Sequence, residues 1–545
     1  MLLLTTLLIS IVITIALMPF TRELACRLQA VDRPNQRKIH EQDMPKCGGM
    51  AMAVGAMTPL VLWAPMTDFN KSLLIGTVII VLFGIADDIK DLSPYMKLLG
   101  QFLAAIVAIF IGGIRIADFG NLLPAGIVMP QWLVIPVTVV VIIGVTNATN
   151  LSDGLDGLAG GIALLIFLCI GYLGAIEKDW YVTMACIAVG GAVFGFLRFN
   201  SHPAQLFMGD AGSQLLGFVA IMLSIKLTQQ SDRLSVLLPL IIIGLPILDT
   251  LTVMIKRLAK GRSPFAADRT HFHHQLIEIG FFHTEAVLVI YVAQSLLITF
   301  AIVYHQLNDW LILSFYLCFS LSVLGSSHFF EKTGYRVNRD LFLNKIKARL
   351  QPLKDRGQAI KIAFGIVKYG VPSLLLFNAL FPSPGGRYYF IYSIIFLALL
   401  AIEWFLKKPF LDRLIKLGLY LLTPFIIYHC DQGLYMYLDP TFIIAYNLLY
   451  LVLLIAVFFT MRLTRRANGF KSSTLDFLVI FVILLIPNLP GAAIKGYHLG
   501  LVAVKAVILY YSYEVLVGET RKKRLGLPFS IAIFVIGIKS YFLGI

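Results

Sequence analysis

Two apolar stretches joined by a short polar one indicate the fold class of this protein. Residues 131–146 read QWLVIPVTVVVIIGVT, residues 158–174 read LAGGIALLIFLCIGYLG, and the segment between them, 147–157, reads NATNLSDGLDG. Each apolar stretch is about as long as a helix must be to cross a ~30 Å hydrocarbon core. Similar runs recur along the whole chain, so the sequence predicts an all-α, polytopic integral membrane protein.

Composition supports this class. The 545 residues have a mean hydropathy of +0.84, with 58% hydrophobic and only 14% charged residues. Soluble globular chains carry about a quarter charged residues, so an ordinary soluble protein is excluded. The first apolar run, Leu2 to Phe20, has no basic region before it and no small-residue cleavage site after it. We therefore expect a retained first helix and not a removed signal peptide.

The apolar runs predict about eighteen spans in two groups. About 11 transmembrane helices are expected within residues 1–330 and about seven within residues 363–545, with a cytoplasmic linker at 331–362. The first group is expected near 2–20, 48–66, 72–86, 98–114, 131–146, 158–174, 180–197, 213–227, 235–255, 285–303 and 310–326. The second is expected near 363–380, 388–405, 415–429, 441–460, 474–489, 498–516 and 527–543.

Basic residues are concentrated in alternate loops. If the N-terminus lies outside, the inside loops of the first half and the 327–362 segment hold twenty-three Lys and Arg, whereas the outside loops hold four. This asymmetry follows the positive-inside rule. The sequence therefore predicts an outside N-terminus, and the sorting of charge across the membrane explains the net charge of +15 without a nucleic-acid partner.

Five polar clusters interrupt the apolar pattern of the first half. They are Asp87-Asp88-x-x-Asp91 followed by Lys97 and Gln101; Asn147-x-x-Asn150-x-x-Asp153-Gly154-x-Asp156-Gly157; Phe207-Met208-Gly209-Asp210; Pro246 with Asp249; and Arg262-Ser263-Pro264 leading to Asp268-Arg269-Thr270-His271-Phe272-His273-His274. The predicted topology puts all five at or near the inside face, the Pro246/Asp249 pair lying within a span. We therefore expect one cytoplasmic site.

Each cluster alone has an ordinary interpretation. Acidic pairs at helix ends are commonly solvated, and Asp-Gly pairs commonly form turns. Carboxylates at membrane depth, however, are costly to bury and are functional by default. Five clusters on one side of the membrane favour a functional site over coincidence.

These residue types together suit phosphate transfer assisted by a divalent metal. Mg²⁺ is typically held by one or two carboxylates plus substrate phosphates, and basic side chains supply charge and donors for a diphosphate. No Gly-rich Walker loop is present, which disfavours an ATPase, and the His-x-His-His pattern lacks the Glu and spacing of a zinc protease. Two alternatives stay open: a transporter or flippase of lipid-linked sugars, and an inactive membrane scaffold.

In their order and spacing, the motifs from Asp87 to His274 resemble the polyprenyl-phosphate N-acetylhexosamine-1-phosphate transferases, and the His271-x-His273-His274 pattern is similar to the WecA/TagO-like branch, related to MraY. The resemblance covers about residues 1–330. It implies transfer of N-acetylhexosamine-1-phosphate, with GlcNAc-1-phosphate expected, from a UDP-sugar to undecaprenyl phosphate. UMP would be released and a cell-surface glycan initiated at the bacterial inner membrane.

The resemblance also implies a role for each motif residue. Mg²⁺, or Mn²⁺ in its place, would be bound by Asp210 and Asn150. Asp87 and Asp88 would handle the lipid phosphate, one of them as a base or metal-adjacent carboxylate. Asp153 and Asp156 would face the nucleotide, and Phe207 would stack on uracil. The remaining groups would hold the diphosphate: Lys97, Arg269, His271, His273 and His274.

Residues 363–545 carry no motif of this kind. Their notable polar residues within expected spans are His429, Glu403 and Glu514, which we interpret as anchors near helix ends. Later enzymes of the same glycan pathway are the expected partners of this half.

Overall fold

The computed structural model describes most of the first half of the chain and part of the second. The described residues are 2–33, 43–122, 129–231, 233–263, 270–334, 336, 358–380, 423, 426–463, 474–485, 499–519 and 535. They form two compact units: unit 1 comprises Met1–Val337 with Ser473–Leu478, and unit 2 comprises Asn338–Ser472 with Val479–Ile545. The predicted domain boundaries at 330 and 363 stay predictions.

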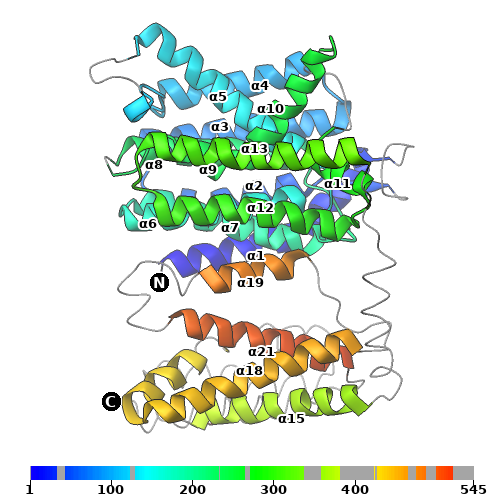
Figure 1. The fold of residues 1–545 in the computed structure, drawn as a ribbon. Helices are drawn as coiled ribbons and strands as arrows, with labels where there is room; N and C mark the ends of the chain where they lie inside the picture. Colours follow the sequence, from blue (N-terminus) through cyan, green and yellow to red (C-terminus); the bar gives the residue numbers. More distant parts are fainter. Residues whose placement is uncertain are drawn as a thin grey trace. The chain divides into compact units, whose positions relative to one another are not determined.

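Unit 1 is almost entirely helical (Figure 1). Its helices are α1 (Leu2–Arg27), α2 (Gly48–Trp63), α3 (Asp68–Lys90), α4 (Pro94–Phe110), α5 (Gln131–Leu151), α6 (Leu158–Ile176), α7 (Trp180–Asn200), α8 (Gly209–Gln229), α9 (Leu238–Ile242), α10 (Gly244–Ala259), α11 (Phe272–Ile279), α12 (His283–Tyr304) and α13 (Asp309–Thr333), with a short 3₁₀ turn, η1 (Gly120–Leu122). Two short strands, β1 (Val31–Asp32) and β2 (Met44–Pro45), pair antiparallel.

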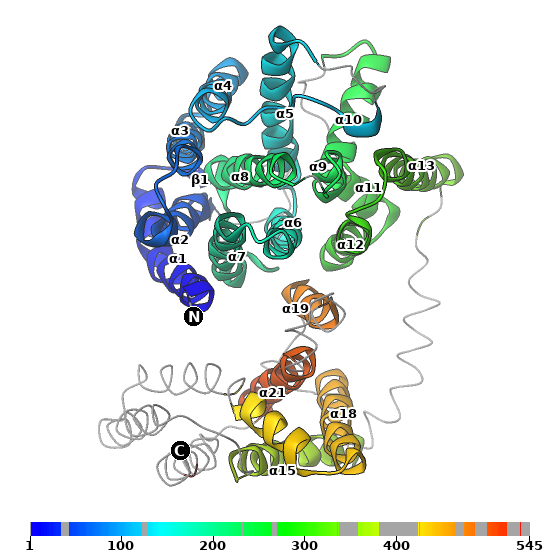
Figure 2. The same cartoon turned by 90° about the vertical axis from the view of Figure 1, so that its left-hand side faces the viewer.

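Helix α8 is the centre of unit 1. Viewed along the helices, it is surrounded by α2, α3, α5, α6 and α7 (Figure 2). In the apolar part of α8, 94% of the residues are buried inside the protein. In the apolar parts of α1 and α13, only 17% are buried. A helix buried on all sides presents its N-terminus to side chains from several neighbours, and this end of α8 carries the Gly209-Asp210 motif.

Small residues allow the neighbouring helices to approach α8 closely. A Cβ atom at Gly84 of α3 would collide with the backbone of Ala211, and one at Gly49 of α2 would collide with the backbone of Gly212. Gly209 has φ +70°, a conformation that L side chains rarely adopt. The glycines therefore bring the ends of α2 and α3 against the first turn of α8.

The described helices agree with the predicted fold class. Ten of them are long and apolar enough to cross a membrane, eight in unit 1 and two in unit 2, and α2 and α4 are shorter apolar helices. Each of the eleven expected runs of the first half overlaps a helix, except that 235–255 is split into α9 and α10. Pro246 accounts for the split, because a proline ring clashes with the carbonyl four residues earlier, at Ile242. Several expected spans of the second half lie outside the described residues.

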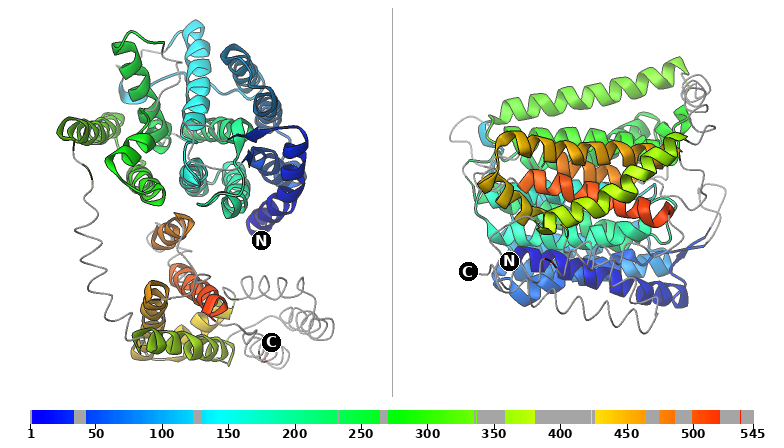
Figure 3. Two further views of the ribbon diagram at one scale, coloured as in Figure 1. Left: turned by 90° about the vertical axis from the view of Figure 1, so that its right-hand side faces the viewer. Right: turned by 90° about the horizontal axis from the view of Figure 1, so that it is seen from below.

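The described part of unit 2 contains α15 (Gln358–Leu380), a helix over 426–437, α18 (Pro440–Leu463) and α21 (Leu499–Glu519). Helices α15, α18 and α21 pack pairwise (Figure 3). Helix α19 (Thr474–Leu485) begins in unit 1 and passes into unit 2 after Leu478.

Candidate active site

The centre of the candidate site is a lysine between two aspartates. Lys97 Nζ lies 2.5 Å from Asp87 Oδ2 and 3.0 Å from Asp210 Oδ2. Asp87 is in the last turn of α3 and Asp210 in the first turn of α8. Lys97 follows closely on Pro94, the first residue of α4, where a proline fits because its missing N–H has no helical acceptor. Three helix ends therefore meet at one cation.

Asp88 has a different environment from Asp87. Its carboxylate accepts hydrogen bonds from the backbone N–H groups of Asp210 (3.0 Å) and Ala211 (3.3 Å). It thereby caps the N-terminus of α8, where negative charge is favourable. Lys46 Nζ lies 3.9 Å from Asp88 Oδ1 and also 3.9 Å from Asp32. The side chain of Asp88 is thus occupied in holding α3 to α8, whereas Asp87 points to Lys97.

The segment before α8 is held by backbone bonds. Phe207 N–H donates to Pro45 O (2.9 Å), and Phe207 O accepts from the N–H groups of Cys47 (3.1 Å) and Gly48 (3.0 Å). Lys46 and Phe207 form a parallel bridge. Because of this pairing, Lys46 arrives beside Asp88, and the motif Phe207–Asp210 is held at the start of α2.

Amides and a hydroxyl complete the surroundings of Asp210. Asn150 Nδ2 and Gln214 Nε2 each lie 3.4 Å from Asp210 Oδ2. Ser213 Oγ donates to Asn150 Oδ1 at 2.5 Å. Gln214 accepts in turn from Gln101, which bonds Asn147. A polar network that continues inward between helices therefore brings Asn150 to Asp210; its role as a metal ligand stays a prediction.

The loop 152–157 brings two further carboxylates to the same end of unit 1. Asp153 is half-buried, and burial, reinforced by the negative charges of Asp210 and Asp88, raises its pKa to about 7. The end of this loop is fixed at Gly157, whose N–H donates to Asn200 Oδ1 (2.9 Å) and whose carbonyl accepts from Tyr291 (2.6 Å).

Asp156 is the second carboxylate of this loop. It accepts from the N–H of Ala204 (3.1 Å) and lies 2.7 Å from His202 Nδ1. Its carboxylate therefore joins the loop before α6 to the turn after α7.

The predicted histidine loop is the start of a helix. His271 is the N-cap of α11, and His273 and His274 are in its first turn. Asp249 of α10 holds this turn, accepting from Phe272 N–H (2.9 Å) and pairing with His271 Nδ1 (2.9 Å). The sequence pattern did not predict this helix, because its 8 residues are too few to show a clear apolar period.

His273 connects the histidines to the loop 152–157. A Cβ atom at Gly154 would collide with its ring, so the glycine leaves room for this contact. His273 is buried, and burial, with the neighbouring His274 and His271, lowers its pKa to about 3. The ring is therefore neutral at physiological pH and offers hydrogen bonds, where the sequence suggested positive charge.

The structure thus brings Asp87, Lys97, Asn150 and Asp210 together by direct contacts, with Asp88 capping the same helix. Asp153, Asp156, His271, His273 and His274 lie in the adjoining loop and in α11. Arg269 lies outside the described residues. Lys46, Ser213 and Asn200 were not predicted; only Ser213 carried a signal, one turn after Gly209 in the motif.

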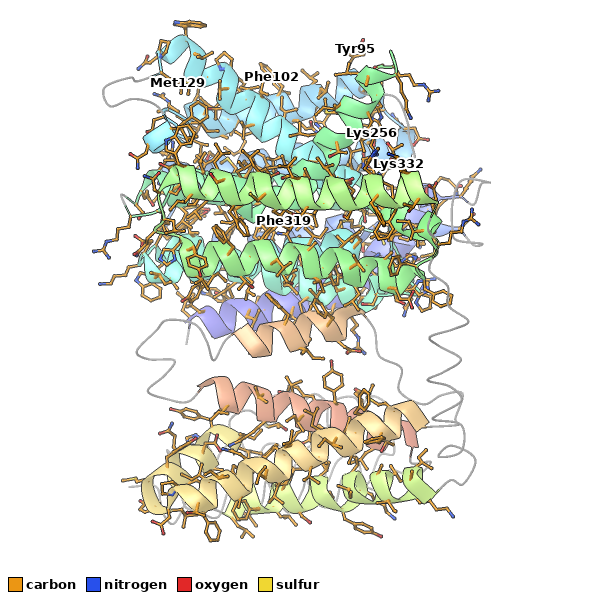
Figure 4. The ribbon with its side chains drawn as sticks, in the orientation of Figure 1. Tyr95, Phe102, Met129, Lys256, Phe319 and Lys332 are labelled. Atoms are coloured by element: carbon orange, nitrogen blue, oxygen red, sulfur yellow. The ribbon has the colours of Figure 1, made fainter. Side chains whose placement is uncertain are left out.

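Basic residues lie at the end of unit 1 that carries α11. Lys256 of α10 and Lys332 of α13 lie at one end of unit 1, and Met129, before α5, lies at the other (Figure 4). Lys256 Nζ is 3.5 Å from Glu331 Oε2. The basic ends of these helices lie near α11, the helix that carries His273.

The residues present fit a divalent metal of the Mg²⁺ type. Asp210 offers hard carboxylate oxygens, and the Asn150 side chain, whose Nδ2 faces Asp210 and whose Oδ1 accepts from Ser213, can offer its oxygen if the amide turns. Mg²⁺ takes one or two such protein ligands beside substrate phosphates. Lys97 adds a positive charge at the same point. The arrangement suits binding and neutralising a diphosphate.

Comparisons with known proteins place this chain among transferases of similar sequence. Residues 71–228 match the model of glycosyl transferase family 4. A Bacillus subtilis protein named a probable undecaprenyl-phosphate N-acetylglucosaminyl 1-phosphate transferase is 33% identical over 305 residues, 56% of this chain and 85% of the relative. A Mycolicibacterium smegmatis decaprenyl-phosphate N-acetylglucosaminephosphotransferase is 32% identical over 305 residues, 50% of this chain and 74% of the relative.

A third relative, the Yersinia pestis undecaprenyl-phosphate alpha-N-acetylglucosaminyl 1-phosphate transferase, is 29% identical over 339 residues, 61% of this chain and 91% of the relative. These matches cover most of each relative but little more than half of this chain. The ordered motifs from Asp87 to His274, the meeting of several of their residues at the head of α8 and these relatives together lead to one conclusion: the chain belongs to the polyprenyl-phosphate N-acetylhexosamine-1-phosphate transferase family.

Proposed function

We propose that this multi-pass membrane protein transfers N-acetylhexosamine-1-phosphate, with GlcNAc-1-phosphate expected, from a UDP-sugar to undecaprenyl phosphate and releases UMP. The observation that carries the proposal is the convergence of Asp87, Lys97, Asn150 and Asp210 at the N-terminus of a buried helix. The names of the relatives support the acceptor and the sugar.

In the proposed reaction, an oxygen of the lipid phosphate attacks the phosphorus that bears the sugar. The bond from that phosphorus to the oxygen bridging it to the uridine monophosphate breaks, and UMP leaves with that oxygen. The products are UMP and a lipid diphosphate sugar, so atoms and charge balance. A phosphate monoester is already largely ionised near neutral pH, so we expect positioning and charge neutralisation to supply most of the rate.

Lys97 is the main cation of the proposed site. Its contacts with Asp87 and Asp210 hold the ammonium group where a diphosphate would carry negative charge. Asp210 and Asn150 would hold Mg²⁺, or Mn²⁺ in its place. When bound, the metal ion would neutralise the substrate phosphates and polarise the phosphorus that is attacked.

We assign the two adjacent aspartates different roles. Asp88 is a positioning residue, because both of its oxygens accept backbone N–H groups of α8. Asp87 is the carboxylate that acts directly toward the lipid phosphate, since it faces Lys97. Asp153, Asp156 and Phe207 would contact the nucleotide. His271, His273, His274 and Arg269 would hold the diphosphate.

We also propose that the protein lies in a bacterial inner membrane, with the site on the cytoplasmic face and the N-terminus outside. The asymmetry of Lys and Arg between alternate loops supports this orientation. On that face the enzyme would meet a nucleotide sugar and begin a surface glycan. A flippase is not favoured, because the clustered acids lie at helix ends at one end of unit 1 and not along a path across it.

The test is an assay of the purified full chain with undecaprenyl phosphate, Mg²⁺ and a panel of UDP-sugars, scoring UMP and lipid-linked product. We expect both products in equal amounts with UDP-GlcNAc. Removing Mg²⁺ with EDTA should abolish both products, and adding Mn²⁺ in excess of the EDTA should restore both. UMP release without a lipid product, or no turnover with any sugar in the panel, would overturn the proposal.

A further inference from the structure

A second polar cluster lies at the end of the loop 152–157. It is distinct from the acidic centre formed by Asp87, Lys97 and Asp210. Asp156, in the loop before α6, lies 2.7 Å from Nδ1 of His202, in the turn after α7. The same carboxylate oxygen lies 3.9 Å from Nε2 of His283, the first residue of α12. One ligand atom from each residue lies within 4.8 Å of the other two. Three distant parts of unit 1 therefore meet at one point.

His283 marks this point as a site for a ligand. Both of its ring nitrogens are buried, and neither makes a hydrogen bond of standard geometry to a described residue, the Asp156 carboxylate lying 3.9 Å from Nε2. Buried polar groups without a partner are rare and costly. The ring stacks on that of His202, with centroids 4.3 Å apart and an interplanar angle of 22°. His202 is the more open of the pair, its side chain 39% exposed, so an ion can reach the cluster from solvent.

We propose that Asp156, His202 and His283 bind a transition-metal ion of the Zn²⁺ type, and that this ion inhibits the enzyme by withdrawing Asp156 from the nucleotide. The inhibition rests on the proposed function; the metal site does not. Two imidazoles and one carboxylate are ordinary Zn²⁺ ligands, with a fourth position left open. Tetrahedral bonds of about 2.0–2.2 Å put neighbouring ligand atoms about 3.3 Å apart. The distances of 2.7 and 3.9 Å lie on either side of this value.

The ligand atoms of this site differ from those around Asp210. Imidazole nitrogens suit Zn²⁺, Cu²⁺ and Ni²⁺, whereas Mg²⁺ prefers oxygen ligands. Binding needs Nδ1 of His202 to be free of its proton, and a neutral ring with the proton on Nε2 meets that need. Asp156 then exchanges its hydrogen bond from His202 for a bond to the metal. The two stacked rings must turn so that Nδ1 of His202 and Nε2 of His283 both point at the ion.

The experiment measures Zn²⁺ binding to the purified, EDTA-treated full chain by competition with a chromophoric chelator. Co²⁺ in place of Zn²⁺ gives visible absorption bands whose intensity reports a four- or five-coordinate site. We expect one ion per chain, bound at least tenfold more weakly by His283→Gln and by His202→Gln. The control is His328→Gln, an exposed histidine of α13 outside the cluster, which should bind as the wild type does.

His202 is partly exposed, so its variant should fold even if the His283 variant does not; a thermal midpoint for each variant checks this. Binding that is equal in folded variants and wild type, or absent in the wild type at micromolar Zn²⁺, would overturn the site. In the UMP assay, Zn²⁺ should compete with UDP-GlcNAc in the wild type and inhibit folded variants at least tenfold more weakly. Zn²⁺ that binds here without inhibiting would overturn the inhibitory role. If no UMP is released in Mg²⁺ alone, the proposed transferase activity is refuted. The chelator competition would still show whether the Zn²⁺ site exists.

Discussion

Asp210 is the residue on which the site depends. Its carboxylate accepts hydrogen bonds from Lys97, Asn150 and Gln214. These contacts hold the carboxylate where, in the proposed reaction, phosphate and metal would meet. Asp88 and Asp87, adjacent in sequence, face different partners because a helix turns by about 100° per residue.

We expect Asp210→Asn to reduce UMP release below about a tenth of the wild-type rate at saturating Mg²⁺, because loss of a metal ligand costs several kcal/mol of transition-state stabilisation. The variant should still insert and fold, since an amide occupies the same space. The matched control is Asp68→Asn, an exposed acid in the first turn of α3, which should keep near-normal activity. Substantial turnover by the Asp210 variant would contradict the metal assignment.

The pKa of His273 predicts how the stability of the protein depends on pH. Its pKa falls from 6.5 to about 3 on folding, so the folded state disfavours the proton. The stability from its neutral ring is complete above pH about 6.5 and is lost as the pH falls toward 3. The thermal midpoint in detergent should therefore drop between pH 7.5 and 5, and it should drop less in His273→Gln. Equal drops in the two proteins would show that His273 does not carry this effect.

At the scale of elements, the contact between α3 and α8 decides whether the motifs meet. Gly84 faces Ala211 with no room for a side chain, and Asp88 binds the N–H groups at the head of α8 one turn later. Glycine here costs helix stability in isolation, and the close packing of two helices offsets that cost.

We expect Gly84→Leu to lower the thermal midpoint and to abolish activity, because the new side chain must push the backbone of α8 away from Asp88. The control is Gly144→Ala in α5, where an added Cβ meets nothing within 4 Å. That change should leave activity intact and stabilise the helix by up to about 1 kcal/mol. A Gly84→Leu protein with normal kcat would refute the close-approach account.

At the scale of the whole molecule, the second unit contains a buried ion pair that the hydropathy pattern does not reveal. Lys505 of α21 lies 2.7 and 2.9 Å from the two carboxylate oxygens of Asp431, and the two side chains are 3% and 1% exposed. The Lys505 ammonium also lies 4.3 Å from the ring centroid of Tyr446. Hydropathy gave no signal, because Asp431 follows the end of an expected span and Lys505 is a single charge within another.

Removing one partner of this pair should destabilise unit 2 strongly. Lys505→Met removes the ammonium group that neutralises the buried Asp431 carboxylate, and such changes cost about 3–5 kcal/mol. The double variant Lys505→Met with Asp431→Leu should recover most of that loss, because both buried charges of the pair are then gone. Thermal unfolding of the three proteins in one detergent measures this. A double variant no more stable than Lys505→Met would show that the pair contributes more than mutual neutralisation.

A truncation after residue 360 tests whether unit 2 takes part in catalysis. All matched motifs end before 275, so we expect a stable protein that releases UMP at a near-normal rate. The truncation also removes Phe477, which unit 1 includes and which stacks on Tyr291 at 6.2 Å between centroids. We therefore expect a modest loss of thermal stability. A folded but inactive truncation would place part of the site in the second half.

The sequence by itself determined the class of the protein and most of its helices, because a span is a local property: about twenty apolar residues must satisfy their own backbone hydrogen bonds in lipid. The motif residues were also visible, since carboxylates are costly at membrane depth. Only the tertiary structure decided which of them touch: that Asp88 caps α8 while Asp87 pairs with Lys97, that Lys46 joins them through the Phe207 bridge, and that His283 reaches Asp156. These contacts join residues far apart in the chain, and they depend on how closely helices pack, which no local pattern records.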